Sequence, residues 1–410
     1  MRHPHPLKES AAIASPIDPT APMRPGVLGP LGPAQLTCLR SWRKRGMHPL
    51  FVHLTPDTGT PGWPGIPGHY LAIPRDSLLT PDGRARLIAF LSANRCDGLT
   101  CLGEADAHIL RTLEMDLPCP LWLPSAASLD FLDAKSRQAE WARACGFQVL
   151  PTWHADKTLL PEIPAEAYPI IARPDGAHSV DPMFKIRMLP SQEALTRWLD
   201  TFRTLHRPVL LQPFLDGPNL VIHAATDARG EPLVLTAFLV RRKFEGVTLT
   251  IEPAPLDPSL RTACAAFCRG IGLHGCLHFE LLIDPRNATP WFLEVNGRLG
   301  GTTGKVYALG FDEPYLLLQA HDLLPPPKPL TLAPEGTVVT NRLALMKLLL
   351  AMARHDPALA QDPSGTPRTW RDLLTGLLLW RDEIFQRADP GCTLWYLRDW
   401  LTDRLHRKNR

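Results

Sequence analysis

Two apolar segments, 279–284 and 291–298, constrain the fold most strongly, because each of them carries one carboxylate. Both read as buried strands, since they are rich in aromatic and branched residues and are separated by a turn-rich run. Glu280 interrupts the first segment and Glu294 interrupts the second. Burying a carboxylate costs free energy unless a cation lies beside it. The pattern therefore predicts two neighbouring strands whose acidic groups hold a cation.

The second segment adds polar residues at alternate positions. Asn296 and Arg298 follow Glu294 at intervals of two, so all three point to the same face of a strand. Two carboxylates and an amide oxygen suit Mg²⁺, which usually serves the phosphates of a nucleotide, and Mn²⁺ fits the same ligands. A hairpin whose polar face is only solvated would explain the alternation as well.

Composition narrows the class of protein. A chain of 410 residues with 45% hydrophobic and 21% charged residues is typical of a soluble protein with two or three domains. A net charge of +3 argues neither for nor against nucleic acid, and we expect no nucleic-acid partner. Nine scattered Cys without a CxxC pair indicate reduced thiols in a cytoplasmic protein. No apolar run is long enough for a transmembrane helix, and we expect no membrane partner and no signal peptide.

The first part of the chain predicts an α/β domain. Residues 1–22 are rich in Pro and His and read as a disordered arm. From 23 to 132, strands alternate with helices, which favours a parallel, doubly wound sheet. The expected strands are 27–29, 50–54 and 98–102, and the expected helices are 34–45, 81–94 and 104–115. The turn at 29–32 lacks both common phosphate-loop patterns and is interpreted as a plain turn.

The rest of the chain predicts two further lobes and an extension. A helix capped by Asp133 should end at Gly146. The small lobe (about 152–215) should hold strands 168–174, 184–188 and 209–217 and a helix from 191 to 204. The large lobe (about 216–325) should hold antiparallel strands 220–226, 233–241 and 247–252, a helix from 258 to 272, and the two acidic strands. Residues 326–410 read as a strand, 336–340, and three helices, 342–354, 368–387 and 393–407.

Four stretches in this order resemble the ATP-grasp superfamily, in particular its carboxylate-amine ligases. The run 133–135, with Gly146 and Pro151, looks like the family's lysine-bearing linker helix and its exit. The run 170–174 looks like the strand that ends in Lys-Pro, with Arg173 in place of the lysine. The run 211–217 looks like the adenine hinge, and Glu280 with 294–298 looks like the metal site. The resemblance covers roughly residues 24–325.

The resemblance implies a role for each matching residue. Lys135 and Arg173 would bind the α- and β-phosphates of ATP. The hinge would bind adenine and ribose, with Leu215 as the backbone donor because Pro213 has no N–H. The implied ATP-binding set also includes Gln212, Phe214, Asp216, Asn219 and Leu282. Glu280, Glu294 and Asn296 would hold Mg²⁺, while Arg298 and a basic residue from 241–243, with Arg241 and Lys243 as our candidates, would stabilise the moving phosphoryl group.

The implied fold is ATP-grasp: an N-terminal doubly wound α/β domain, two α+β lobes that clamp ATP, and a helical C-terminal extension. The implied reaction converts a carboxylate into an acylphosphate and joins it to an amine, with release of ADP and phosphate. Residues 300–303 would then line the acceptor side. The substrates would be small molecules, and a homodimer is left open.

Two departures from the family pattern support an alternative function. The flap at 175–182 has one glycine where the family has several, and the lysine before Pro174 is replaced by Arg173. Both would suit an ATP-binding regulatory protein that is catalytically weak or inactive. A third hypothesis keeps the enzyme and changes the chemistry to carboxylation through carboxyphosphate, although the sequence has no Met-Lys-Met motif for biotin attachment.

Overall fold

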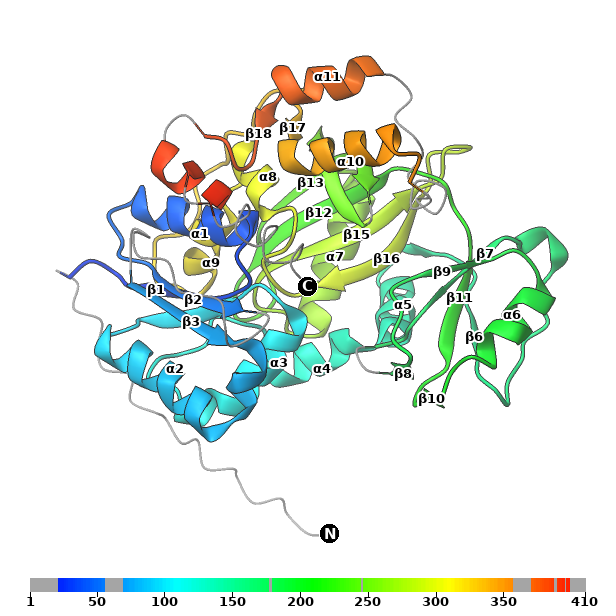
Figure 1. Cartoon of the computed structure of the whole chain (residues 1–410), viewed down its shortest axis with the longest axis horizontal. Coiled ribbons are helices and arrows are strands. Elements are labelled where there is room, and N and C mark those ends of the chain that lie inside the picture. The colour runs from blue at the N-terminus through cyan, green and yellow to red at the C-terminus, as the bar shows by residue number, and fades with distance from the viewer. Residues whose placement is uncertain are drawn as a thin grey trace, which may run out of the picture.

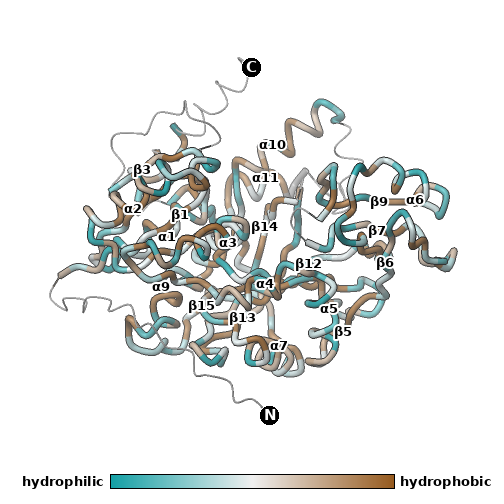
Figure 2. The backbone as a smooth tube through the Cα atoms, turned by 90° about the horizontal axis from the view of Figure 1, so that it is seen from below, coloured by the Kyte–Doolittle hydropathy of each residue, from teal (hydrophilic) through white to brown (hydrophobic). Residues whose placement is uncertain are grey.

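The computed structural model describes residues 21–55, 69–176, 179–244, 246–356, 370–386, 389–394 and 396–398. The predicted N-terminal arm lies almost wholly outside these residues, as does much of the helix predicted at 393–407. Figure 1 shows an N-terminal α/β part, a large central sheet, and a smaller lobe built around β6, β7, β9 and β11. Hydrophobic segments run through the middle of the molecule, and hydrophilic ones collect towards its rim (Figure 2).

The N-terminal sheet is parallel, as the alternation of strands and helices predicts. Its strands lie in the order β3-β2-β1-β4, with bounds Pro25–Gly29 (β1), Leu50–Thr55 (β2), His69–Pro74 (β3) and Gly98–Cys101 (β4). The helices are Pro33–Arg43 (α1), Pro81–Ala93 (α2) and Glu104–Leu113 (α3). The sequence reading missed β3, because this edge strand is mostly half-buried and lacks clear alternation.

Two consecutive helices, α4 (Ala126–Asp133) and α5 (Lys135–Ala144), link this domain to the lobes. The expected cap is wrong, because Asp133 ends α4 and Ala134 takes the cap position of α5 without a side-chain bond. Asp175 supplies the acceptors instead. The Lys135 N–H donates to the Asp175 backbone oxygen at 2.8 Å, and the Ser136 N–H donates to its Oδ1 at 2.7 Å. The helix therefore begins on a residue of the small lobe.

The small lobe is an antiparallel sheet in the order β6-β11-β7-β9. Its strands are Trp153–Ala155 (β6), Ile170–Arg173 (β7), Arg187–Leu189 (β9) and Val209–Pro213 (β11). The helix α6 (Gln192–Leu199) is capped by Ser191 and buries Leu195 and Leu199 against this sheet's core. It ends earlier than predicted, and the chain continues as β10 (Thr204–Leu205), which pairs with β8 (Val180–Asp181).

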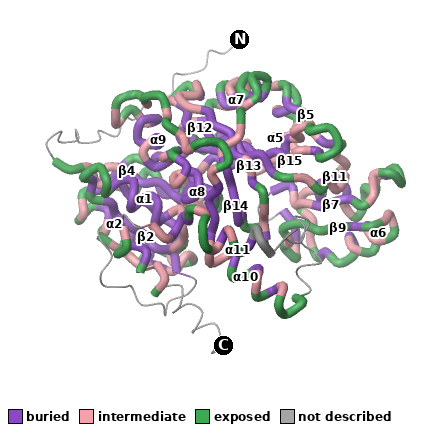
Figure 3. The backbone as a smooth tube through the Cα atoms, turned by 90° about the horizontal axis from the view of Figure 1, so that it is seen from above, coloured by how far each residue is buried: buried purple, intermediate pink, exposed green. Residues whose placement is uncertain are grey.

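The large lobe is an eight-stranded sheet in the order β18-β17-β14-β13-β12-β15-β16-β5. Its main strands are Asn219–Thr226 (β12), Pro232–Phe244 (β13), Val247–Ala254 (β14), Gly275–Ile283 (β15) and Pro290–Asn296 (β16). Every residue of β12 is buried, because Val221 and Ala225 enter one hydrophobic core while Leu220 and Ile222 enter another (Figure 3). Helix α7 (Pro258–Gly270) packs into the second core. The short strand β5 (Gln148–Val149) joins β16 in parallel.

The C-terminal part continues the large sheet past the predicted boundary at 325. Strands β17 (Val339–Thr340) and β18 (Arg381–Asp382) extend the sheet beyond β14. Helix α10 (Arg342–Ala353) matches the prediction, whereas α11 (Trp370–Leu378) ends well before residue 387, since the chain then enters β18. The domain boundaries themselves stay predictions. Within the described ranges, no helix has the length and apolar character needed to cross a membrane.

Candidate active site

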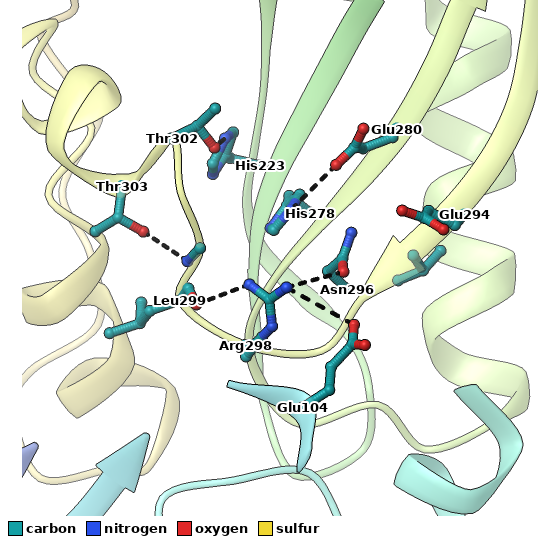
Figure 4. Close-up of polar contacts among 12 residues, drawn as sticks. Glu104, His223, His278, Glu280, Glu294, Asn296, Arg298, Leu299, Thr302 and Thr303 are labelled. Atoms are coloured by element: carbon teal, nitrogen blue, oxygen red, sulfur yellow. Dashed lines mark hydrogen bonds and ion pairs between the residues drawn. The ribbon is translucent and has the colours of Figure 1, made fainter. Parts of the chain in front are cut away.

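The two acidic strands lie side by side, as the sequence predicts. In the register of β15 and β16, Glu280 is opposite Glu294 and His278 is opposite Asn296. Both carboxylate side chains are 22% exposed, so they are partly shielded from water. The two carboxylates and the Asn296 amide therefore come together on one face of the large sheet, next to Arg298 (Figure 4).

Two cations from outside the large sheet meet at Glu294. Arg173, at the end of β7, places Nη2 2.5 Å from Glu294 Oε2, and Lys135, at the start of α5, places Nζ 3.4 Å from the same oxygen. Burial raises the pKa of Glu294, but Arg173 and Lys135 outweigh it and lower that pKa to about 2. The structure thus brings together the two residues predicted to bind phosphate, although they lie on different elements.

Glu280 has its own cation, which comes from β13. Lys243 Nζ lies 3.3 Å from Glu280 Oε2, reaching across β12. Arg241, the other candidate on this strand, pairs instead with Glu252 of β14, with Nε 2.5 Å from Oε1. Of these two predicted residues, Lys243 is therefore the one beside the candidate metal ligands.

Arg298 lies at the end of the acidic strand pair. Its Nη2 donates to Asn296 Oδ1 at 3.3 Å and lies 3.9 Å from Glu104 Oε1, at the start of α3 (Figure 4). Its buried Nε has no hydrogen-bond partner among the described residues. The sequence reading missed Glu104, since an acidic residue in the first turn of a helix ordinarily needs no further explanation.

The predicted adenine hinge connects the two lobes. The Phe214 N–H donates to the Pro169 backbone oxygen at 2.9 Å, and Pro213 has no N–H, which leaves Leu215 as the next backbone donor. The Gln212 side chain is buried and donates to Thr152 Oγ1 at 3.0 Å. The Gln212 side-chain amide therefore already has a partner within the protein.

The large sheet begins beside this hinge. Asn219 opens β12 three residues after the exposed Asp216 and is the register partner of Leu282 on β15. Leu282 lies two residues from Glu280, so both side chains share a face of the sheet. This arrangement places an apolar side chain between the hinge and the carboxylates.

The oxygen set fits a hard cation. Among the described residues, no three His, Cys, Asp or Glu side chains gather as a metal cluster. The candidate ligands are instead two carboxylates and one amide oxygen, which are the donors that Mg²⁺ prefers. Their negative charge is balanced here by Lys135, Arg173 and Lys243. A bound metal would replace these cations as the partner of the carboxylates, and a bound phosphate would replace the carboxylates as the partner of the cations.

His278 is a site residue that the sequence did not reveal. It is 4% exposed, with Nε2 3.8 Å from Glu280 Oε1 and with an Nδ1 that has no partner in the described part of the chain. Burial, together with His223 and Arg298, lowers its pKa to about 3, so the ring is neutral. A single histidine in an apolar strand gives no signal of this kind.

Comparisons with solved structures identify the fold. The biotin carboxylase of Campylobacter jejuni, solved as a β,γ-ATP complex, superposes with a TM-score of 0.58 and 17% identity over 75% of this chain and 73% of that one. N5-carboxyaminoimidazole synthetase from Staphylococcus aureus gives 0.59 and 14%, over 82% and 86%. L-amino acid ligase from Bacillus licheniformis gives 0.54 and 15%, over 73% and 74%.

These three proteins are members of the ATP-grasp superfamily, and the chain has the ATP-grasp fold that the motifs predict. A scan against protein-family models gives no match, and neither does a search of curated proteins. The likeness therefore establishes the fold, and the chemistry has to be argued from the residues of the site.

Proposed function

We propose that this chain, which has the ATP-grasp fold, is an ATP-dependent ligase that activates a carboxylate as an acylphosphate and joins it to an amine. The observation that carries the proposal is the meeting of Arg173 and Lys135 at Glu294, directly opposite Glu280. These groups come from a linker helix, the small lobe and the large lobe. Such convergence of charge on a half-buried spot is typical of a site rather than of a solvated surface.

The charges match the proposed substrates. ATP carries about four negative charges, and phosphoryl transfer depends mostly on positioning and charge stabilisation. The site offers Lys135, Arg173, Lys243 and Arg298 around two carboxylates and an amide. Bound Mg²⁺ would neutralise phosphate charge here, held by Glu280, Glu294 and Asn296. Arg173 and Lys135 would then turn from Glu294 towards phosphate oxygens.

The remaining residues divide between nucleotide and acceptor. Leu215 offers the hinge donor, Leu282 packs near the base, and Asp216 or Asn219 binds the ribose hydroxyls. Arg298 and the loop after it face the acceptor carboxylate and amine. We place this reaction of small molecules in the cytoplasm.

Glu294→Gln tests the proposal for two reasons. It removes the negative charge of a candidate metal ligand, and it removes the carboxylate that both Arg173 and Lys135 contact. Release of ADP and phosphate is measured with Mg·ATP and pooled amino acids and small carboxylates as acceptors. We expect the wild type to release both products and Glu294→Gln to lose at least about 100-fold in rate. Glu252→Gln, at a carboxylate on the same sheet that pairs with Arg241, is the matched control. Full activity of Glu294→Gln would overturn the metal assignment.

A catalytically inactive ATP-binding protein is the second candidate, favoured by the contacts of Gly176 and Ser179. Ser179 Oγ donates to the Gly176 backbone oxygen at 2.9 Å, so this hydroxyl already has a partner within the chain. A Cβ at Gly176 would lie 2.7 Å from Arg207 Nη1 and 2.8 Å from Asp133 Oδ2, so the backbone at Gly176 is closely packed. Binding of Mg·ATP without product release, with every acceptor in the pool, would support this candidate and contradict the ligase.

A further inference from the structure

A set of buried polar side chains lies behind the loop that follows Arg298. We call residues 299–303 the acceptor loop. Its Leu299, Gly300, Thr302 and Thr303 are buried, whereas Gly301 is exposed and has no heavy atom within 4 Å of the position that a Cβ would take. The loop therefore has one open position, three residues after Arg298, on an otherwise packed segment.

The first connection behind the loop runs through His223 of β12. Its Nδ1 lies 2.6 Å from Oε1 of Glu313, the first residue of α9 (Glu313–Ala320), and its Nε2 lies 3.0 Å from Thr302 Oγ1. His223 and Glu313 are fully buried. Burial raises the pKa of Glu313, but His223 and the Thr303 hydroxyl outweigh it and lower that pKa, which favours the ionised carboxylate. The carboxylate then accepts from His223 Nδ1–H, and Nε2 shares a second hydrogen bond with the Thr302 hydroxyl.

The second connection runs through Thr303, which begins α8 (Thr303–Ala308). Its hydroxyl donates to Glu313 Oε2 and accepts from the Gly300 N–H at 2.9 Å. Both oxygens of Glu313 are thus used, one for each connection. The loop is consequently fixed at its start, through Gly300, and at its end, through Thr302 and Thr303.

The same set also fixes the loop relative to the acidic strands. The rings of His223 and His278 stack with centroids 5.3 Å apart, and His278 is two residues from Glu280 on β15. A Cβ at Gly300 would lie 2.6 Å from His278 Cε1 and 3.1 Å from Arg298 Nη1. The acceptor loop therefore lies directly against the strand that carries the candidate metal ligand.

We propose that Glu313, His223 and Thr303 are positioning residues, which hold Gly301 and Arg298 as a rigid rim of the pocket for the acceptor substrate. This inference rests on the proposed function. Misplacing a reacting group by about 1 Å can cost about 100-fold in rate, so holding the rim with four buried hydrogen bonds offsets the cost of burying these polar groups. Gly301 leaves the space in which the acceptor lies.

Thr303→Val tests the inference, because valine keeps the shape of threonine and removes the hydroxyl. Steady-state ADP release is measured with pooled amino acids as acceptors, and amide hydrogen exchange is measured across the acceptor loop. We expect kcat/KM for the acceptors to fall at least about tenfold, KM for Mg·ATP to change less than about twofold, and loop amides to exchange at least about tenfold faster. Thr303→Ser, which keeps the hydroxyl, should restore all three values.

Thr226→Val is the matched control, since Thr226 is a buried threonine on the same strand as His223 and donates to the Gly275 backbone oxygen at 3.2 Å. It should lower thermal stability without changing acceptor kinetics or loop exchange. The inference is overturned if Thr303→Val matches Thr226→Val in both readouts. If the wild type releases no ADP, the proposed function fails, and loop exchange alone then decides whether the buried set holds the loop.

Discussion

The cations of this site already form ion pairs within the protein, and any anionic ligand must compete with their carboxylate partners. Arg173 and Lys135 both contact Glu294, so a bound phosphate would exchange places with a carboxylate rather than meet free cations. Such an exchange lowers the affinity for phosphate and keeps the charges from being buried alone. The partly shielded position of Glu294 makes the pairs stronger than surface ion pairs.

Arg173 allows this competition to be measured. Arg173→Lys keeps the charge but not the planar fork, so we expect the Kd for Mg·ATP to change by less than about threefold. Arg173→Met removes the charge, and we expect binding to weaken at least about tenfold, which corresponds to about 1.4 kcal/mol. Isothermal titration calorimetry gives both values.

Arg203→Met is the control for this series. Like Arg173, Arg203 is a small-lobe arginine that pairs with a carboxylate, here Asp181, but its side chain is 78% exposed. It should bind Mg·ATP like the wild type. Equal affinities of Arg173→Met and Arg203→Met would show that Arg173 does not contact phosphate.

The predictability of the site differs between residues for a physical reason. Glu280, Glu294 and Asn296 stand out because a charged or amide residue interrupts an apolar strand, and the period of two assigns them to a face. Asp175 and His278 give no such signal. Asp175 caps a helix that begins 40 residues earlier in the chain, and His278 acquires its role only where β15, β12 and the acceptor loop meet.

At the scale of elements, α8 and the C-terminal strands are joined by a buried ion pair. Lys305 of α8 places Nζ 2.6 Å from Glu383 Oε1, and the same oxygen accepts from Asn341 Nδ2 at 2.6 Å. Both charged side chains are at most 1% exposed. The other carboxylate oxygen of Glu383 has no partner in the described part of the chain. The helix that follows the acceptor loop is therefore fastened to the C-terminal segment.

Lys305→Met should destabilise the protein strongly, because it leaves Glu383 buried without its cation. Removing one partner of a buried pair costs about 3–5 kcal/mol, and we expect a loss in that range in urea unfolding. The double variant Lys305→Met/Glu383→Gln removes the second charge and keeps an acceptor for Asn341. It should recover to within about 1 kcal/mol of the wild type. A double variant as unstable as Lys305→Met would exclude a buried-charge effect.

The elements that the sequence predicts are the long ones with a clear period. Strands β12, β14 and β16 and helices α1, α2 and α7 follow the predicted ranges closely, because each has a run of apolar residues at its own spacing. Strand β15 begins at Gly275, four residues before the predicted start, and β13 ends at Phe244, three residues after the predicted end. Strands β5, β17 and β18 have two residues each, which is too short for any period, and only β17 lies within a predicted strand, 336–340. Their pairing partners are distant in sequence, so only the tertiary fold assigns them to the large sheet.

At the scale of the whole molecule, several histidines are buried in neutral form. Burial lowers the pKa of His53 to about 4, while burial and His274 lower that of His321 to about 3. The neutral ring of His53 contacts the Tyr70 hydroxyl at 2.8 Å. The unfolded chain binds a proton at these positions near pH 6.5, whereas the folded chain does so only at lower pH.

The protein should consequently lose stability on acidification. The stabilisation linked to His53 is complete above pH 6.5 and is lost as pH falls towards 4, by up to about 3 kcal/mol. His53→Gln removes this proton uptake and should flatten the dependence of the unfolding free energy on pH between 6.5 and 4. Urea unfolding at intervals of half a pH unit measures it. An unchanged slope in the variant would contradict the linkage.

The small lobe joins the large sheet through only two short connections, 150–152 and 214–218. Gln212 and Thr152, beside one connection and within the other, are hydrogen-bonded to each other, so the two connections lie close together. At a separate point, Arg173 of the small lobe contacts Glu294 of the large sheet. The small lobe is thus joined to the large sheet by two chain connections on one side and by an ion pair at another point. If bound phosphate takes Arg173 away from Glu294, as the proposed function requires, then nucleotide binding itself breaks this contact between the lobes. The Arg173–Glu294 ion pair would then set the order of events in turnover, because ATP would have to bind before the small lobe takes its catalytic position.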